Sequence, residues 1–536
     1  MDSPSSENLF TFLSYSLANF QAAFFRIPGS AVLTRYVKSS HQDDPGRTLL
    51  EVILALFVIR TLLQSRTRTD RSGGKHFIQF SDKEIDDLVD EWTPEPLDPP
   101  LTEQQEADLA AIPVIAGPTG PKPKLMNTGK PCVNLASLNF AGLAGNEHIQ
   151  QRAIETMRKY GVGSCGPSGF YGTIDVHTEL EQRISDFLGT ESSVLYAQGF
   201  STICSVIPAF CKRSDIIIAD RGVNFAIQKG LQISRSTIRW YDHNDLSSLE
   251  SVLESVAKEM KRRRSQKHAR KFIVTEGLFE QDGAMVDLPK LVELKEKYKF
   301  RLILDETLSF GSIGRTGRGL TELYNVPAAR VDMIIGSLAI GLCSSGGFCA
   351  GSLTATSHQR HNALSFVFSA SLPALLAVSA LEGINLLVNT PSILNNLQEN
   401  VRAARAILDR LDCVTIPSHS ASPVIHIHLK TNSTSLHPST AVVSTKPSNP
   451  SSVLPRDAAN WTWDAETEEQ ILQEVVEDAL AQGVLITKAK RLRGQELVDP
   501  RPSIRLALTS ALSKKDTEKA VGVVRSSLIK VLGKRR

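Results

Sequence analysis

The sequence predicts an α/β protein: a large domain with a mostly parallel sheet, a smaller C-terminal α/β domain and an N-terminal hydrophobic membrane helix. Short apolar, β-branched runs alternate with helical stretches between residues 126 and 400, as in parallel sheets covered by helices on both faces. A second group of strands follows residue 400, and a long apolar run precedes residue 80. The strands expected in the large domain are residues 193–196, 215–220, 271–276, 301–305 and 333–336.

The N-terminal region, residues 1–80, is expected to anchor the chain to a membrane. Residues 9–27 are rich in Phe and Leu and almost uncharged, which favours an interfacial helix over a loosely packed arm. A hydrophobic helix is expected over about residues 48–64, and its run from Leu49 to Leu63 is apolar apart from Glu51 and Arg60 near the two ends, where long side chains can reach headgroups. The run is short for a bilayer span, yet a short or tilted transmembrane helix is favoured over a soluble core helix.

Basic residues flank this helix on both sides. Four follow it, Arg66, Arg68, Arg71 and Lys75, and three precede it, Arg35, Lys38 and Arg47. By this small margin the positive-inside rule places the C-terminal body in the cytosol.

Residues 81–125 are expected to form a proline-rich linker that opens with an acidic helix over residues 82–91. Prolines at this density do not support a packed helix or a central strand, so the globular body is expected to start near Met126.

The large domain is expected to span residues 126–400, followed by a small domain over residues 401–536. A helix around residues 393–411 leads into it. Its Ser/Thr/Pro-rich stretch, residues 431–455, is interpreted as a surface insertion. The strands expected in the small domain are residues 424–429, 484–486 and 504–508.

Composition excludes several classes of protein. A net charge of +3 over 536 residues gives no support to nucleic-acid binding. The basic run at residues 261–264 is typical of the solvated end of a helix. The seven cysteines are scattered, without metal-ligand spacing, so we expect reduced thiols and neither a disulfide framework nor a metal site.

Two glycine-rich stretches are candidate ligand-binding loops. Residues 159–181 form a glycine-dense loop that leads into a helix near Asp175, although they match no standard phosphate-loop pattern. Residues 332–351 form a buried strand, a Gly/Ser/Ala loop and a Gly346-Gly347 turn into a second apolar segment, and the loop contains no lysine.

Together with other short motifs, these loops resemble the α-oxoamine synthases over residues 125 to 515. These are pyridoxal-phosphate (PLP) enzymes of the aspartate-aminotransferase-like fold (fold type I) that condense an amino acid with an acyl-CoA. The further motifs that agree in order and spacing are Gln198-Gly199-Phe200, His243-Asn244-Asp245, Thr275-Glu276-Gly277, Asp282-Gly283, Asp305-Glu306 and Gly317-Arg318-Gly319.

The resemblance implies which residues keep a family role. Asp305 matches the acid that pairs with the pyridine nitrogen of PLP, and Arg505 matches the arginine that receives the substrate carboxylate. Gly199 and Phe200 also match the family pattern.

Four other family positions are altered. Asn224 stands where the resemblance places a ring-stacking histidine, Glu280 replaces a serine, and Leu308 replaces a second histidine. Ile340 stands at the position of the Schiff-base lysine, and an isoleucine cannot form an imine. We therefore expect no catalytic residue in this chain's own pocket.

Among these synthases the chain resembles the lysine-lacking subunit of a membrane-bound heterodimer that condenses L-serine with palmitoyl-CoA to 3-oxosphinganine. The resemblance implies a homologous, lysine-bearing partner subunit that holds PLP covalently, a position at the endoplasmic reticulum membrane with the large domain in the cytosol, and room for small regulatory subunits. Because active sites of this family lie between two chains, Cys165, Gly166 and Tyr171 are candidates for a contribution in trans. The alternative for Cys165 is a structural role, as a small hydrophobic residue in a closely packed turn at the interface.

Two alternative functions remain open at this point. One is a self-sufficient synthase that uses another lysine, such as Lys229 or Lys488. The other is a purely scaffolding or regulatory membrane subunit.

Overall fold

The computed structural model describes residues 25–26, 28–67, 80–98, 100–262, 269–430, 465–489, 492 and 494–533. The chain divides into two compact units, Met1–Ala110 and Ala111–Arg536. The insertion expected at residues 431–455 and nearly all of the interfacial helix expected at residues 9–27 lie outside the described residues.

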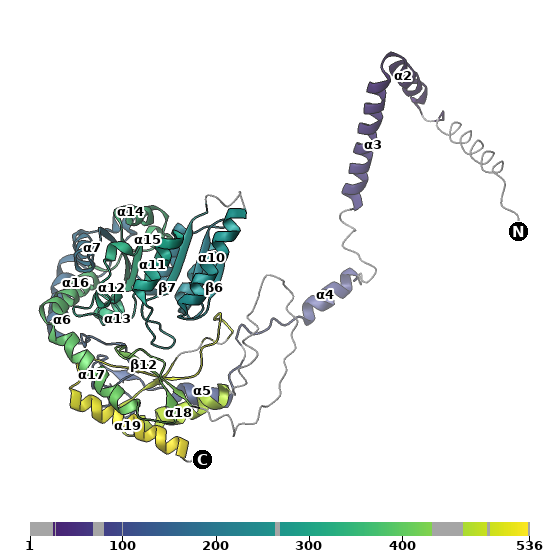
Figure 1. Ribbon diagram of the computed structural model, residues 1–536. Helices are drawn as coiled ribbons and strands as arrows, with labels where there is room; N and C mark the ends of the chain where they lie inside the picture. The colour runs from purple at the N-terminus through teal and green to yellow at the C-terminus, as the bar shows by residue number, and fades with distance from the viewer. Residues whose placement is uncertain are drawn as a thin grey trace. The chain divides into compact units, whose positions relative to one another are not determined.

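The N-terminal unit is built of helices and contains no named strand within the described residues (Figure 1). The helices are α2 (Ser30–Asp43), α3 (Pro45–Thr67), α4 (Asp82–Glu91) and α5 (Glu103–Ala111), the last ending at the boundary between the units. Asp44 accepts hydrogen bonds from the backbone N–H groups of Gly46 and Arg47, and Pro45 occupies a first-turn position that lacks a hydrogen-bond partner in any helix.

Helix α3 contains the apolar run expected at residues 48–64, and ten of its large apolar side chains, from Leu49 to Leu62, are 47–65% exposed. Within the described residues, no single helix has both the length and the mean hydropathy of a bilayer span. The bent pair α16 (Ala374–Asn389) and α17 (Ser392–Leu408), which meet at 77°, passes this test by length and composition, and both helices bury apolar residues in the core. A membrane-crossing α3 remains a prediction.

The larger unit is built on a seven-stranded sheet in the order β4-β10-β9-β8-β7-β5-β6. Strand β10 is antiparallel to both of its neighbours, and the other neighbouring strands are parallel. The bounds are β4 (Ser192–Tyr196), β5 (Ile216–Asp220), β6 (Thr237–Tyr241), β7 (Lys271–Glu276), β8 (Arg301–Asp305), β9 (Met333–Ser337) and β10 (Gly347–Gly351). All five expected strands are therefore confirmed.

Two strands of this sheet were not expected from the sequence. Strand β6 lies at the edge of the sheet and is only half-buried, so it lacks a continuous apolar run. Strand β10 begins and ends with glycine, which the sequence pattern favours as turn. Its glycines are packed tightly, because a Cβ on Gly347 would lie 3.0 Å from the carbonyl oxygen of Gly336 in the neighbouring strand.

Helices cover both faces of the sheet, as the apolar strands require (Figure 1). One face packs against α8 (Gly199–Phe210), α9 (Phe225–Ser234), α14 (Leu353–Asn362) and α15 (Leu364–Phe368). The other packs against α7 (Asp175–Leu188), α10 (Leu246–Arg262), α11 (Leu288–Tyr298) and α16, and α6 (Glu147–Tyr160) lies against α16. The helix expected near Asp175 is thus confirmed.

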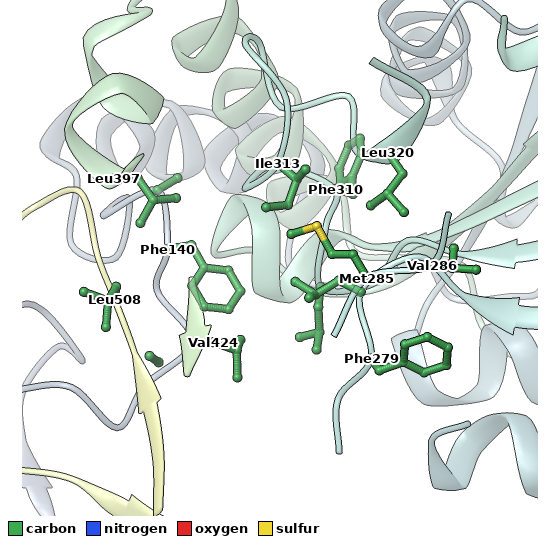
Figure 2. Close-up of a cluster of buried hydrophobic side chains, with 14 of the residues drawn as sticks. Phe140, Phe279, Met285, Val286, Phe310, Ile313, Leu320, Leu397, Val424 and Leu508 are labelled. Atoms are coloured by element: carbon green, nitrogen blue, oxygen red, sulfur yellow. The ribbon is translucent and has the colours of Figure 1, made fainter. Parts of the chain in front are cut away.

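The C-terminal part forms a second, four-stranded antiparallel sheet in the order β11-β12-β15-β14. The strands are β11 (Val414–Thr415), β12 (Val424–Leu429), β14 (Thr487–Lys488) and β15 (Ile504–Ala507). Helix α18 (Ala465–Ala481) packs against β14, and α19 (Lys514–Gly533) packs against both α17 and α18. Figure 2 shows that Val424 and Leu508 of this part face the same apolar core as Phe310 and Met285 of the large sheet's loops.

The compact body starts earlier than the expected Met126. Strand β1 (Ile115–Ala116) pairs antiparallel with β2 (Lys124–Leu125), so part of the expected linker 81–125 is folded. Strand β3 (Val133–Asn134) pairs in parallel with β13 (Val484–Leu485), so residues near 133 join the C-terminal part rather than the large sheet. Prolines at residues 118, 121 and 123 are compatible with this pair because they lie in the connection between its two short strands.

Candidate functional site

The carboxyl ends of strands β5, β7, β8 and β9 bring polar residues to one edge of the sheet, where ligands of such sheets bind. Asp305, the last residue of β8, is buried there. Its carboxylate accepts hydrogen bonds from Asn224 Nδ2 at 3.0 Å and from the Thr307 backbone N–H at 2.9 Å. Burial raises the pKa of Asp305, and the hydrogen bonds from Thr307 and Asn224 partly offset this rise.

Asn224 has three structural tasks at this edge. Its side-chain oxygen caps α9 by accepting a hydrogen bond from Ile227 N at 3.0 Å, while its amide nitrogen binds Asp305. Its backbone N–H donates to Glu276 Oε1 at 2.5 Å. The residue is therefore held by the cap and by two buried carboxyl groups, and it provides no aromatic ring.

Glu276, part of the Thr275-Glu276-Gly277 motif, is a buried acid opposite Asp305 in the neighbouring strand, and the sequence assigned it no chemical role. Besides Asn224, the backbone N–H of Glu280 donates to it, at 3.1 Å. Burial, followed by the nearby charge of Asp305, raises the pKa of Glu276 well above its usual range. Both carboxyl oxygens of Glu276 therefore accept backbone N–H groups beside Asp305, and burial together with the charge of Asp305 favours the protonated form of this acid.

We expect Asn224→Ala to destabilise the chain by about 2 kcal/mol, because it removes a helix cap and leaves a buried carboxylate with one donor fewer. Ser352→Ala is the matched control. Ser352 caps α14 by accepting from Ala355 N at 3.3 Å but bonds no buried acid, so it should cost about 1 kcal/mol. Equal losses in urea unfolding would show that the bond to Asp305 contributes nothing.

Ile340 lies on the short helix α13 (Leu338–Leu342), which directly follows β9. Its side chain is half-buried and packs against the main hydrophobic core. The helix is pressed onto the loop after β8, since a Cβ on Gly311 would lie 2.9 Å from the Cα of Gly341. Leu308, the second apolar replacement, is buried in the same core.

Gly199 and Phe200 open helix α8 near the end of β9. A Cβ on Gly199 would lie 3.2 Å from Ser337 Oγ and 3.5 Å from the Gly346 carbonyl oxygen, so this position leaves little space for a side chain. The Phe200 ring is 55% exposed and lies 6.3 Å from the ring of Phe225. Lys229, one of the alternative lysines, places its ammonium 4.6 Å from the centre of the Phe225 ring.

Arg505 lies in β15 opposite His426 of β12. Among the described residues, Arg505 Nε and His426 Nε2 are buried without a hydrogen-bond partner. Burial lowers the pKa of Arg505, and the charge of Glu280 opposes this shift. Burial and the neighbouring His428 lower the pKa of His426 to about 3, so this histidine is neutral. A buried guanidinium Nε without a partner is compatible with the carboxylate-binding role expected of Arg505, and His426 was not predicted from the sequence.

Lys488, the other alternative lysine, lies in β14 at the edge of the C-terminal sheet. It lines a cavity of about 450 Å³ together with Leu472, Pro502 and Ser503.

The glycine-dense loop packs as a tight turn on the segment that follows α15. Ser371 N donates to the Gly166 carbonyl oxygen at 3.0 Å, and Ser164 Oγ donates to the Ser371 carbonyl oxygen at 2.8 Å. Cys165 and Tyr171 have positive φ angles of 59° and 65° and are exposed, Tyr171 at 101%. The expected in-trans residues therefore share one exposed turn, while the other predicted site residues lie at the sheet edge and in β15.

Comparison with known proteins identifies the family. The model of the class I and II aminotransferases matches residues 130–524. The chain is 46% identical over 381 residues to long chain base biosynthesis protein 1b of Oryza sativa subsp. japonica, covering 71% of this chain and 77% of that protein. It is 36% identical over 538 residues to serine palmitoyltransferase 1 of Saccharomyces cerevisiae, covering 96% and 95%. The chain belongs to the serine palmitoyltransferase 1 and long chain base biosynthesis protein 1 family.

Solved structures share the fold of this family member. A serine palmitoyltransferase from Sphingomonas wittichii superposes with a TM-score of 0.66 at 20% identity, covering 84% of this chain and 98% of that chain. 8-Amino-7-oxononanoate synthase from Francisella tularensis superposes with a TM-score of 0.57 at 17% identity, covering 74% and 98%. The expected PLP-dependent aminotransferase fold with a mostly parallel sheet is therefore confirmed.

The residues present in this family member do not fit a covalently bound PLP. The cofactor requires an amine for its aldehyde, an acid facing its ring nitrogen and a ring stacked on its face. Ile340 provides no amine and Asn224 provides no ring. Asp305 is retained, and the hydrogen bond from Asn224 links it to the cap of helix α9.

Proposed function

We propose that this chain is subunit 1 of serine palmitoyltransferase, the subunit without the Schiff-base lysine. With a homologous, lysine-bearing subunit it condenses L-serine and palmitoyl-CoA into 3-oxosphinganine, the first step of sphingolipid long-chain base biosynthesis. PLP is held covalently by that partner and not by this chain. Relatives named serine palmitoyltransferase 1 at 36% and 38% identity support this proposal.

One observation carries the proposal: Ile340, at the expected lysine position of a PLP-enzyme fold, lies on the short helix α13 and packs against the main hydrophobic core. The site remains ordered, because Asn224, one of the altered positions, forms hydrogen bonds with both Glu276 and Asp305. A site rebuilt in this way keeps the fold while the covalent chemistry takes place on another chain.

Exposed aromatic residues on the glycine-dense loop support a partner at this face. Phe170, Tyr171 and Phe368 are 63%, 101% and 74% exposed, and a bridge between Pro167 and Ala370 holds the two segments together. Large apolar side chains gathered on one surface are typical of protein interfaces. In this proposal Cys165, Gly166 and Tyr171 border the partner's active site.

The proposal places the chain in the endoplasmic reticulum membrane with the large domain in the cytosol. The exposed apolar side chains of α3 support anchoring by this helix, because a helix that is apolar on all sides is stable in lipid. Small regulatory subunits are compatible with such an assembly, and nucleic acid plays no part in it.

Co-expression tests this function. The chain alone should show no PLP absorbance and form no 3-oxosphinganine. When it is purified together with a homologue that has lysine at the position of Ile340, the pair should show PLP absorbance and form 3-oxosphinganine. Borohydride reduction followed by peptide mapping should label a lysine of the homologue only. Turnover by the chain alone with label on Lys229 or Lys488 would instead establish a self-sufficient synthase.

A further inference from the structure

Buried His177 joins two segments of the larger unit that are far apart in the sequence. It lies in the first turn of α7 and is 4% exposed. Its Nδ1 accepts a hydrogen bond from the backbone N–H of Ile174 at 3.1 Å, which closes the start of the helix. Its Nε2 lies 2.5 Å from the carbonyl oxygen of Leu372, which only accepts, so Nε2 carries the proton. Each ring nitrogen therefore makes one defined hydrogen bond.

The segment that receives the Nε2 bond also holds the glycine-dense loop. Leu372 directly follows Ser371, whose backbone N–H donates to the Gly166 carbonyl oxygen at 3.0 Å. The Oγ atoms of Ser371 and Ser168 lie 2.9 Å apart, within hydrogen-bond distance. Residues 370–372, which we name the clamp segment, therefore bind both the loop and, through His177, the first turn of α7.

The glycine-dense loop has a backbone conformation that its residues do not favour on their own. Cys165 and Tyr171 have φ angles of 59° and 65°, in the left-handed region that residues with a side chain seldom occupy. Inside the loop, the backbone N–H groups of Phe170 and Gly172 both donate to the Pro167 carbonyl oxygen. Strained backbone of this kind persists only where surrounding contacts fix it, and it is concentrated at functional sites. The clamp segment provides such contacts from outside the loop.

We infer that His177 is a positioning residue: through its bond to Leu372 it fixes the clamp segment, which holds Cys165 and Tyr171 in place at the partner's active site. This inference rests on the proposed function, in which the loop borders that site. The role of His177 is indirect, because its buried ring binds the clamp segment and the start of α7. Without the bond to Leu372, the clamp segment is free to move away from α7 together with the loop.

Two substitutions separate the tasks of the two ring nitrogens. The side-chain oxygen of Asn replaces Nδ1 as an acceptor, and the side-chain amide nitrogen of Gln replaces Nε2 as a donor. His177→Asn therefore keeps the bond from Ile174 and loses the bond to Leu372, whereas His177→Gln keeps the bond to Leu372. Both variants are prepared in the full-length chain, co-expressed with the lysine-bearing homologue.

His177→Asn should speed amide hydrogen exchange in the peptide covering residues 164–173 at least about ten-fold. It should also lower 3-oxosphinganine formation per assembled pair at least about five-fold, with the PLP absorbance of the pair unchanged, because the loop no longer lies in its productive position. His177→Gln should keep both exchange and turnover within about two-fold of the parent. A loss in His177→Gln as large as in His177→Asn would assign the effect to the start of α7 and overturn the inference.

Asn400→Leu is the matched control for a general loss of stability. Asn400 is 1% exposed, and its Nδ2 donates to the carbonyl oxygens of Thr509 at 2.9 Å and Leu512 at 2.8 Å. The variant should lower the urea midpoint of unfolding as His177→Asn does, and keep loop exchange and turnover within about two-fold of the parent.

Three further results would count against the role of His177. Loop exchange in His177→Asn equal to that of the parent would overturn the inference, and so would faster exchange without a loss of turnover. Equal effects of Asn400→Leu and His177→Asn would show that stability alone is responsible. A parent pair that forms no 3-oxosphinganine would instead refute the proposed function, while loop exchange would still decide whether His177 holds the loop.

Discussion

His243→Gln is expected to lower the free energy of unfolding by about 2 kcal/mol at pH 7, with the loss shrinking toward zero as the pH rises past 10. His243 Nδ1 lies 2.8 Å from Asp220 Oδ1, and Nε2 lies 3.1 Å from Asp282 Oδ2. The imidazole thus joins the end of β5 to the turn that leads into α11, between two carboxylates.

The pH dependence follows from the pKa of His243. Burial alone lowers this pKa, but hydrogen bonds to Asp220 and Asp282 outweigh burial and raise it from 6.5 to about 10. A group whose pKa is higher in the folded state stabilises the fold fully below pH 6.5 and loses this contribution as the pH approaches 10. A completely buried group would contribute more, but the His243 side chain remains 33% exposed.

Urea unfolding of the parent chain and the variant at several pH values between 6 and 10 provides the measurement. His148→Gln is the control, since His148 is 56% exposed and meets Glu382 at 3.3 Å on the surface, so its loss should stay below about 0.5 kcal/mol. A difference between parent and His243→Gln that does not change with pH would contradict the raised pKa.

The sequence predicts the buried strands of the large sheet well because they are uninterrupted apolar runs. Strands β7 and β8 were expected with the bounds that the structure shows, and both are nearly completely buried. Strand β10 could not be recognised because its glycines resemble a turn unless the neighbouring backbone is known. The pairing of β3 with β13 joins residues about 350 positions apart, and no local pattern encodes such a contact.

The candidate site also has features that the sequence predicts and features that only the folded chain shows. The expectation that Ile340 stands at the lysine position comes from the sequence, because a single side chain decides whether an imine can form there. The hydrogen bond from Asn224 to Asp305 is not visible, since the residues are 81 positions apart and either could have faced a ligand. The raised pKa of Glu276 depends on complete burial beside a second acid, which only the folded chain reveals.

Gly172→Ala should disrupt the glycine-dense loop and destabilise the chain by at least about 3 kcal/mol. A Cβ at this position would collide with the carbonyl oxygen of Gly166, and would lie 2.6 Å from the Gly166 carbonyl carbon and 2.7 Å from the Pro167 carbonyl oxygen. The obstacles are backbone atoms, which cannot rotate away as a side chain does. The loop must therefore open, which breaks the hydrogen bond from Gly172 N to the Pro167 carbonyl oxygen at 3.0 Å.

Gly169→Ala in the same loop is the matched control, because a Cβ there meets no atom within 4 Å. Both variants are measured by urea unfolding of the chain and by 3-oxosphinganine formation after co-expression with the lysine-bearing homologue. Gly169→Ala should keep stability within about 0.5 kcal/mol of the parent, whereas Gly172→Ala should also lower the activity of the pair at least ten-fold. If Gly172→Ala displaced the loop while the pair stayed assembled at full activity, the loop would not border the partner's active site, and a scaffolding subunit would explain the chain better.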